Sequence, residues 1–126
     1  MTVLDTLYEA WNRHAIEDVL VQFAPEMHYR DQPLDLNFYR PAELGTHMAN
    51  TFVAMPDLSF VVTSSFDAGN RFAGEAIMRG TFAHDLPGLP ATGDAFEVFY
   101  GIVGELGVDG KITRIIDYWN AQEFVG

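Results

Sequence analysis

Two charged residues in apolar, strand-like segments are the first candidates for chemistry in this sequence. Arg79 lies in the segment IMRGTF, and Asp117 lies in KITRIIDYWN. A charged group in an apolar setting costs free energy unless it is paired, and strongly perturbed groups gather at functional sites. We therefore predict that the stretch from Arg79 to Asp117 contributes to a functional site.

Strand parity divides the candidate residues by face, because alternate residues of a strand point to the same side of a sheet. The register between strands is not readable from one sequence, so parity leaves open whether these faces meet in one pocket. The sets that share a face are Tyr29 with Asp31, Glu75 with Arg79 and Thr81, and Asp117 with Trp119.

The four histidines show no metal-ligand spacing such as HxxxH or HxH, so we predict no metal site. His84, in the loop HDLPGLP, is either an additional acid/base at the mouth of a pocket or an exposed loop residue. His28 alternates with Tyr29 and should face away from the candidate pocket. His47 falls on a predicted helix, and His14 falls in a turn between helices.

The net charge of the chain limits the kinds of molecule that it is expected to bind. The chain has 126 residues, with 7 basic against 18 acidic side chains and a formal charge of −11. Phosphate backbones and anionic lipid surfaces repel such a chain, so we expect no nucleic acid and no membrane as partners. A small, largely apolar metabolite or another protein is the expected partner.

Several kinds of catalytic centre are absent from the sequence. The chain has no cysteine, no glycine-rich phosphate loop and no GxSxG nucleophile segment. We therefore predict chemistry without a cofactor. The first residues lack the basic start and unbroken apolar run of a signal peptide, so we expect a cytoplasmic protein.

Apolar periodicity predicts helices in the first half of the chain and strands in the second. Thr2 can cap a helix over residues 3–13, a second short helix over 16–23 should end before Pro25, and a third should span 41–54. Residues 27–31 form a short predicted strand. Further strands are predicted over residues 58–66, 71–82, 95–106 and 111–119, with hairpin turns at 67–70 and 107–110. This order is typical of one α+β domain over residues 1–126 with a mostly antiparallel sheet.

Several segments in this order resemble the nuclear transport factor 2-like superfamily, and within it the SnoaL-like polyketide cyclases, the ketosteroid isomerases and the limonene epoxide hydrolases. The segments are YEAWNRH, MHYRDQP, PAEL, MPDLSF, RGTF, LPATGD and DGKITRIIDYW. The resemblance implies a cone-shaped α+β barrel, in which a curved sheet wraps around three N-terminal helices. The open interior of such a cone holds a small apolar ligand.

Each of the three groups implies a different role for the acidic residues. In the ketosteroid isomerase pattern Asp31 stands at the general base, but its oxyanion partners have no clear match here. The alternative for Asp31 is a turn aspartate bonded to its own backbone. In the epoxide hydrolase pattern Tyr29, Arg79 and Asp117 match functional residues, whereas Thr81 replaces a required carboxylate.

The SnoaL-like cyclases match best around RGTF, LPATGD and KITRIIDYW. That resemblance makes Asp117 the principal acid/base of an intramolecular aldol closure and Arg79 its orienting partner. Tyr29 and Asp31 would form a second polar cluster, and the alternative for Arg79 and Asp117 is a structural cross-strand ion pair. The expected substrate-binding residues are Trp11, Phe52, Glu75, Thr81, His84 and Trp119.

The resulting expectation is a cofactor-free cyclase or isomerase that acts on a small apolar, carbonyl-bearing metabolite by proton transfer. The alternatives are an epoxide hydrolase or epoxide-opening cyclase, and a non-catalytic ligand-binding or interaction domain. The segment AFEVFYGIV is apolar on both faces of its strand, so both faces should be covered. We therefore also expect a homodimer packed through the outer face of the sheet.

Overall fold

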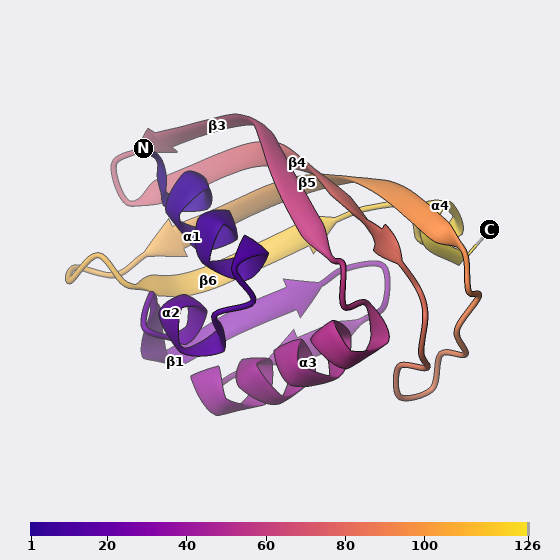
Figure 1. Cartoon of the computed structure of the whole chain (residues 1–126). Coiled ribbons are helices and arrows are strands. Elements are labelled where there is room, and N and C mark those ends of the chain that lie inside the picture. Colours follow the sequence, from indigo (N-terminus) through magenta and orange to yellow (C-terminus); the bar gives the residue numbers. More distant parts are fainter. Residues whose placement is uncertain (126) are drawn as a thin grey trace.

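The computed structural model describes residues 1–125 of the chain, and Figure 1 shows their arrangement. Within the described residues, four helices and six strands follow one another. They are α1 (Val3–Asn12), α2 (Ile16–Leu20), β1 (Phe23–Asp31), β2 (Leu36–Phe38), α3 (Pro41–Ala54), β3 (Ser59–Ala68), β4 (Arg71–Thr81), β5 (Ala95–Leu106), β6 (Ile112–Tyr118) and α4 (Ala121–Val125).

The strands form one sheet in the order β2-β1-β6-β5-β4-β3. The pair β1–β6 is parallel and the other neighbouring pairs are antiparallel. The sheet is curved and open, and α1, α2 and α3 lie on its concave side (Figure 1). The predicted α+β architecture, with helices packed on a curved and mostly antiparallel sheet, is therefore confirmed.

Capping residues set where the helices begin. Thr2 and Asp5 form a capping box in which each side chain bonds the other's backbone N–H. Pro41 occupies the first turn of α3, where its missing N–H leaves no bond unmade. None of the helices in residues 1–125 is long and apolar enough to cross a membrane.

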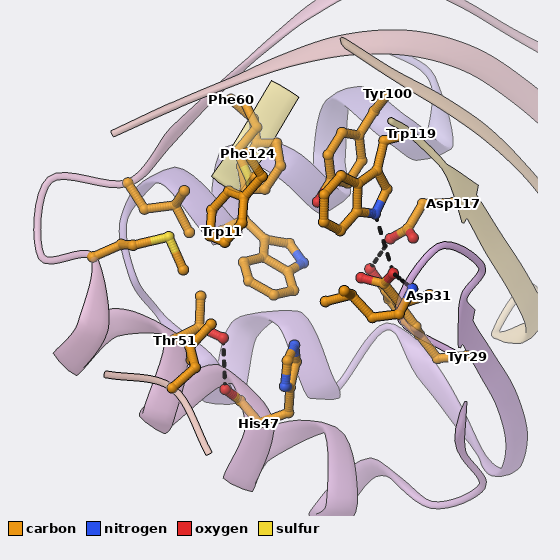
Figure 2. A pocket seen from close by; sticks show the side chains of 15 residues that line it. Trp11, Tyr29, Asp31, His47, Thr51, Phe60, Tyr100, Asp117, Trp119 and Phe124 are labelled. Carbon is orange, nitrogen blue, oxygen red and sulfur yellow. Dashed lines mark hydrogen bonds between the residues drawn. The ribbon is translucent and has the colours of Figure 1, made fainter. Parts of the chain in front are cut away.

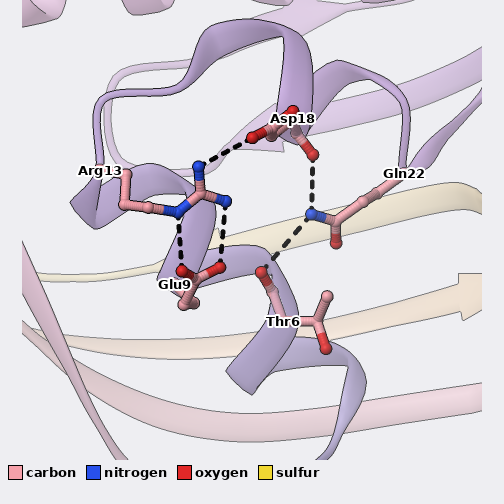
Figure 3. A network of polar contacts seen from close by, with 5 residues as sticks. All are labelled: Thr6, Glu9, Arg13, Asp18 and Gln22. Atoms are coloured by element: carbon pink, nitrogen blue, oxygen red, sulfur yellow. Dashed lines mark hydrogen bonds and ion pairs between the residues drawn. The ribbon is translucent and has the colours of Figure 1, made fainter.

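An exposed polar network joins α1 to α2 (Figure 3). The Arg13 guanidinium lies 2.7 Å from a Glu9 oxygen and 2.8 Å from an Asp18 oxygen. Gln22 donates to the backbone oxygens of Asp18 and Thr6. Water screens such exposed ion pairs, so this network links the two helices but contributes little to the stability of the fold.

The core lies between the helices and the concave face of the sheet. Leu7 of α1, Leu44 and Met48 of α3, and Val98 and Ile102 of β5 are all fully buried there. On β5 the buried residues alternate with exposed ones, as expected for a strand with one covered face.

Three details differ from the sequence-based prediction. Phe23 begins β1 instead of ending a helix, and Pro25 lies inside that strand, where the pairing with β6 shifts register between Phe23 and His28. A proline has no N–H for a regular ladder, so it is tolerated at such an irregularity. The short elements β2 and α4 were not predicted, because three to five residues carry too little periodicity.

Candidate active site

A small cavity lies between the helices and the concave face of the sheet (Figure 2). Its free volume is about 50 Å³. The aromatic part of its wall consists of Trp11, Phe60, Tyr100, Trp119 and Phe124, and its polar groups come from Tyr29, Asp31, His47, Thr51 and Asp117.

Two of these polar groups are carboxyls from neighbouring strands. In the parallel pair β1–β6, Asp31 lies opposite Asp117. Residues opposite each other in a parallel pair point to the same face, so both carboxyls enter the cavity side by side. This register is the information that parity alone could not supply.

Asp117 is almost completely buried and only half satisfied. The Tyr29 hydroxyl donates to Oδ2 of Asp117 at 2.6 Å. The other oxygen, Oδ1, has no hydrogen-bond partner within residues 1–125, although the side chain is only 2% exposed. An unpartnered buried carboxyl oxygen costs free energy, and a carboxyl that carries a proton there could donate it to a ligand.

Asp31 accepts two hydrogen bonds at a single oxygen. The indole Nε1 of Trp119 donates to Oδ1 of Asp31 at 3.1 Å, and the backbone N–H of Leu34 donates to the same atom at 3.3 Å. The second oxygen of Asp31 takes no part in these bonds. The turn-aspartate alternative is therefore partly correct, since Asp31 bonds a nearby backbone N–H while it also borders the cavity.

Burial raises the pKa of both carboxyls, but to different degrees. Desolvation raises the pKa of Asp31 from 3.8 to about 6, against an opposing effect of its hydrogen bonds from Leu34 and Trp119. Desolvation raises the pKa of Asp117 well above its usual range, and the charge of Asp31 raises it further. The pair is therefore unequal, with a pKa of about 6 at Asp31 and a stronger hold on the proton at the more deeply buried Asp117.

The aromatic wall keeps this pair in an apolar setting. The rings of Tyr100 and Trp119 are stacked with centroids 5.5 Å apart, and Phe124 packs edge-on against Trp119 at 5.8 Å. Within residues 1–125 no arginine or lysine lines the cavity, and no three acidic or histidine side chains gather as metal ligands. The wall described by these residues therefore holds both carboxyls without a cation in it, and the only charge that lowers the pKa of Asp31 is that of the more distant Arg30.

The predicted pairing of Arg79 with Asp117 is wrong. Arg79 faces the convex, outer side of β4, where its Nε lies 2.7 Å from a Glu97 oxygen of β5. Both side chains are about half exposed. The inner positions of β4 have the other parity, as the buried Ala76 and Met78 show.

Glu75 and Thr81 share the outer face with Arg79 and do not reach the cavity. Glu75 is exposed, and the Thr81 hydroxyl donates to Asp57 at 2.8 Å. The three residues share one face of β4, as strand parity predicts. That face is the outer one, so the prediction that Glu75 and Thr81 bind substrate is wrong.

Two further predicted binding residues also lie outside the cavity wall. Phe52 packs on the ring of His14, with centroids 4.1 Å apart, and edge-on against Trp11. His84 is exposed in the loop after β4, as its alternative interpretation states. The structure therefore brings together five of the predicted residues, which are Trp11, Tyr29, Asp31, Asp117 and Trp119.

His47 is the polar residue of the cavity that sequence reasoning placed on a helix without a role. Its ring lies against Phe38, with centroids 4.9 Å apart, and makes no hydrogen bond to residues 1–125. Burial lowers the pKa of His47, so the ring is uncharged at neutral pH. The available signal was helical spacing, because His47, Thr51 and Met55 recur every four residues and all face the cavity.

Solved structures with the same fold come from several bacteria. IdmH of Streptomyces antibioticus, a proposed polyketide cyclase, has a TM-score of 0.79 at 22% identity, and the match covers 97% of this chain and 92% of that one. A Catenulispora acidiphila protein with a ketosteroid isomerase-like fold, solved with trimethylamine, has a TM-score of 0.81 at 17% identity over 95% and 86% of the two chains. AclR of Streptomyces galilaeus, a proposed hydroxylase, has a TM-score of 0.79 at 21% identity over 97% and 75%.

These identities establish a shared fold, and the family follows from the sequence itself. A search among curated protein sequences finds no match. The family model described as a SnoaL-like domain matches residues 4–115, which include every residue of the cavity except Asp117, Trp119 and Phe124. The chain therefore belongs to the SnoaL-like family, within the nuclear transport factor 2-like superfamily.

Proposed function

We propose that this protein is a cofactor-free enzyme that forms an enolate from a small, largely apolar ketone and directs it to isomerisation or ring closure. The observation that supports this most is the carboxyl pair Asp31 and Asp117, which lies side by side in one apolar cavity with both pKa values raised by burial. In the proposal Asp31 is the ionised member, and Asp117, the more deeply buried one, is the protonated member. A base and a neutral hydrogen-bond donor side by side are the two groups that enolate formation needs.

In this proposal the Asp31 carboxylate removes a proton from the carbon next to the ketone carbonyl. The electron pair of the broken C–H bond becomes the C–C double bond of the enolate, and the carbonyl oxygen gains the negative charge. Protonated Asp117 donates a hydrogen bond to that oxygen, and Tyr29 holds the Asp117 carboxyl in place through its bond to Oδ2. The principal base is thus Asp31, with Asp117 as the acid.

Two outcomes can follow from the enolate. Asp31 returns its proton to a different carbon, which completes an isomerisation. Alternatively, the enolate carbon forms a C–C bond with a second carbonyl of the same molecule, whose oxygen takes up the proton, which completes an aldol cyclisation. The SnoaL-like family and the resemblance of the fold to a proposed polyketide cyclase favour the cyclisation.

Epoxide opening has less support. The arginine of the epoxide hydrolase pattern falls on Arg79, which lies on the outer face in an ion pair with Glu97. Thr81 stands where that pattern needs a carboxylate, and it too faces outward.

A second candidate function is binding without chemistry. An aromatic wall around the Asp31 carboxylate, with no arginine or lysine among its described lining residues, is suited to a small ammonium ion. The structure with the ketosteroid isomerase-like fold was solved with trimethylamine, which is such an ion at neutral pH. This candidate predicts tight binding of trimethylammonium and no turnover of ketones.

Proton exchange on a ketone distinguishes the two candidate functions, enolate formation and binding without chemistry. Butanone in deuterated buffer should lose the hydrogens next to its carbonyl faster with the protein than without it, as followed by proton NMR. Asp31→Asn should reduce this exchange by roughly 10²- to 10⁴-fold, the usual contribution of a general base. Asp94→Asn, at an exposed carboxylate outside the cavity, is the matched control and should exchange at the wild-type rate. Exchange that is equally fast in Asp31→Asn and wild type would refute the assignment of the base.

A further inference from the structure

A larger groove opens beside the cavity, between β2, α3 and the loop after β4. Its free volume is about 380 Å³. Leu34, His47 and Leu86 border both spaces, so the groove continues the cavity outward. The apolar part of its wall consists of Leu34, Leu36, Phe38, Leu86, Pro87 and Leu89.

The two spaces differ in what they can hold. A cavity of about 150 Å³ holds a benzene ring, and one water needs roughly 10–15 Å³. The inner cavity, at about 50 Å³, therefore accepts a functional group and the carbons next to it, but no ring or long chain. The remainder of any larger ligand bound at the carboxyl pair must lie in an adjoining space, and the groove shares the most wall residues with the cavity and has enough volume.

The charges around the groove indicate whether the rest of the ligand can carry a charge. Glu43 is the charged residue in the groove wall, and ionised Asp31 lies just beyond the boundary. His47 at that boundary is uncharged, because burial lowers its pKa. With Glu43 in the wall, Asp31 in the adjoining cavity and no arginine or lysine among the described lining residues, an anionic tail is repelled and an uncharged apolar tail is favoured.

We infer that the groove is a second binding subsite, which holds the uncharged apolar tail of a ligand whose carbonyl head lies at Asp31 and Asp117. This inference rests on the proposed function for the position of the head group. It assigns the substrate class as neutral ketones with an extended apolar tail, instead of compact ketones or acyl anions.

Tryptophan fluorescence provides a direct assay for occupancy, since both tryptophans of the chain, Trp11 and Trp119, line the inner cavity. The probes are the methyl ketones butanone, hexanone, octanone and decanone. Burial of one methylene increases affinity by roughly threefold to fourfold, so affinity should rise by about that factor with each carbon added in the groove.

A pair of variants on α3 shows where the tail binds. Asn50→Phe puts a ring into the groove from an exposed position that does not border the inner cavity. Ala49→Phe makes a similar change at the next exposed position, which borders neither space. We expect Asn50→Phe to abolish the gain in affinity from hexanone to decanone while butanone binds as before, and Ala49→Phe to keep the whole series.

Each alternative result contradicts a different part of the account. If all four ketones bind with equal affinity, the subsite is refuted while the head-group site stands. If affinity rises with length equally in Asn50→Phe and Ala49→Phe, the tail lies elsewhere and the subsite is again refuted. If no ketone changes the fluorescence or competes with trimethylamine, both the subsite and the proposed function fail.

Discussion

Asp31 and Asp117 differ in their exposure to water and in the groups that donate hydrogen bonds to them. Asp31 is 7% exposed and accepts from Trp119 and Leu34, whereas Asp117 is 2% exposed and accepts from Tyr29. Small differences in burial are enough to separate two neighbouring carboxyls, because ionisation of the first raises the pKa of the second. The proposed chemistry depends on this separation.

The raised pKa of Asp31 has a consequence for stability. Its folded-state pKa, about 6, is above the ordinary value of 3.8, so the folded protein binds this proton more tightly than the unfolded chain does. The free energy of unfolding should therefore fall as pH rises from about 4 to about 6, and it should stay lower above that range.

Asp31→Asn should remove this cost, because the amide oxygen can still accept from Trp119 and Leu34. At pH about 8 we expect the variant to be more stable than wild type by up to about 3 kcal/mol, with little difference at pH about 4. Urea unfolding at both pH values, at matched protein concentration, measures the difference. Equal stability of the two proteins at both pH values would contradict the raised pKa.

At the residue scale the sequence predicted the site in part. Tyr29, Asp31 and Asp117 were found through their types and through a family resemblance, and all three converge. Arg79 could not be placed, because the outer and inner faces of β4 both carry apolar residues and only the pairing with β5 distinguishes them. The role of His47 was missed because a single helical histidine has no distinctive pattern.

At the scale of elements, the parallel pair β1–β6 is the feature that creates the site. It joins the first long strand to the last one, and it aligns Asp31 with Asp117 although 85 positions separate them in the sequence. The two glycines of the neighbouring strand β5 differ in how closely other atoms pack against them. A Cβ at Gly104 would overlap the ring of Phe72 and the backbone oxygen of Arg114, whereas a Cβ at Gly101 would meet nothing within 4 Å.

Alanine at these two glycines should therefore have opposite effects. Gly104→Ala should lower the free energy of unfolding by about 1–3 kcal/mol, because a side chain is forced into a packed region. Gly101→Ala, in the same strand, should be neutral or slightly stabilising, since alanine loses less conformational freedom on folding than glycine does. Urea unfolding of both variants measures this, and a similar loss in both would indicate a general strand effect in place of the close contact.

Most elements were predictable because their patterns are long. The strands β3 to β6 are rich in β-branched and aromatic residues, and their predicted bounds agree with the structure to within two residues. The parallel pairing of β1 with β6 was not predictable, because it depends on how the sheet closes over the helices and not on either segment alone.

At the scale of the whole molecule, the outer face of the sheet exposes several large apolar side chains. Val61, Phe66, Phe99 and Val103 are 39–59% exposed there, and the ion pairs Arg79–Glu97 and Arg71–Glu105 lie on the same face. Water is a poor environment for four large apolar side chains gathered on β3 and β5, the two strands that flank β4. The homodimer expected from the sequence stays a prediction, for which this apolar surface is the structural basis.

A charge placed in that surface should dissociate the dimer. Wild type should have about twice the chain mass of 14.1 kDa in light scattering after gel filtration, and Phe99→Glu should have the mass of one chain. Val108→Glu, at a fully exposed turn position away from this face, is the control and should remain dimeric. A wild-type protein that elutes as a monomer at all concentrations would refute the dimer.

The central claim is that one carboxyl of the pair is ionised and the other protonated at neutral pH. A carbon-13 NMR titration of the aspartate carboxyls, assigned with Asp31→Asn and Asp117→Asn, measures this without knowledge of the substrate. We expect Asp31 to titrate at about 6 and Asp117, whose pKa is raised by burial and by the charge of Asp31, to keep its proton to a higher pH than Asp31 does. Titration of both carboxyls near the ordinary aspartate value of 3.8 would contradict the account, because the cavity would then hold two bases and no acid.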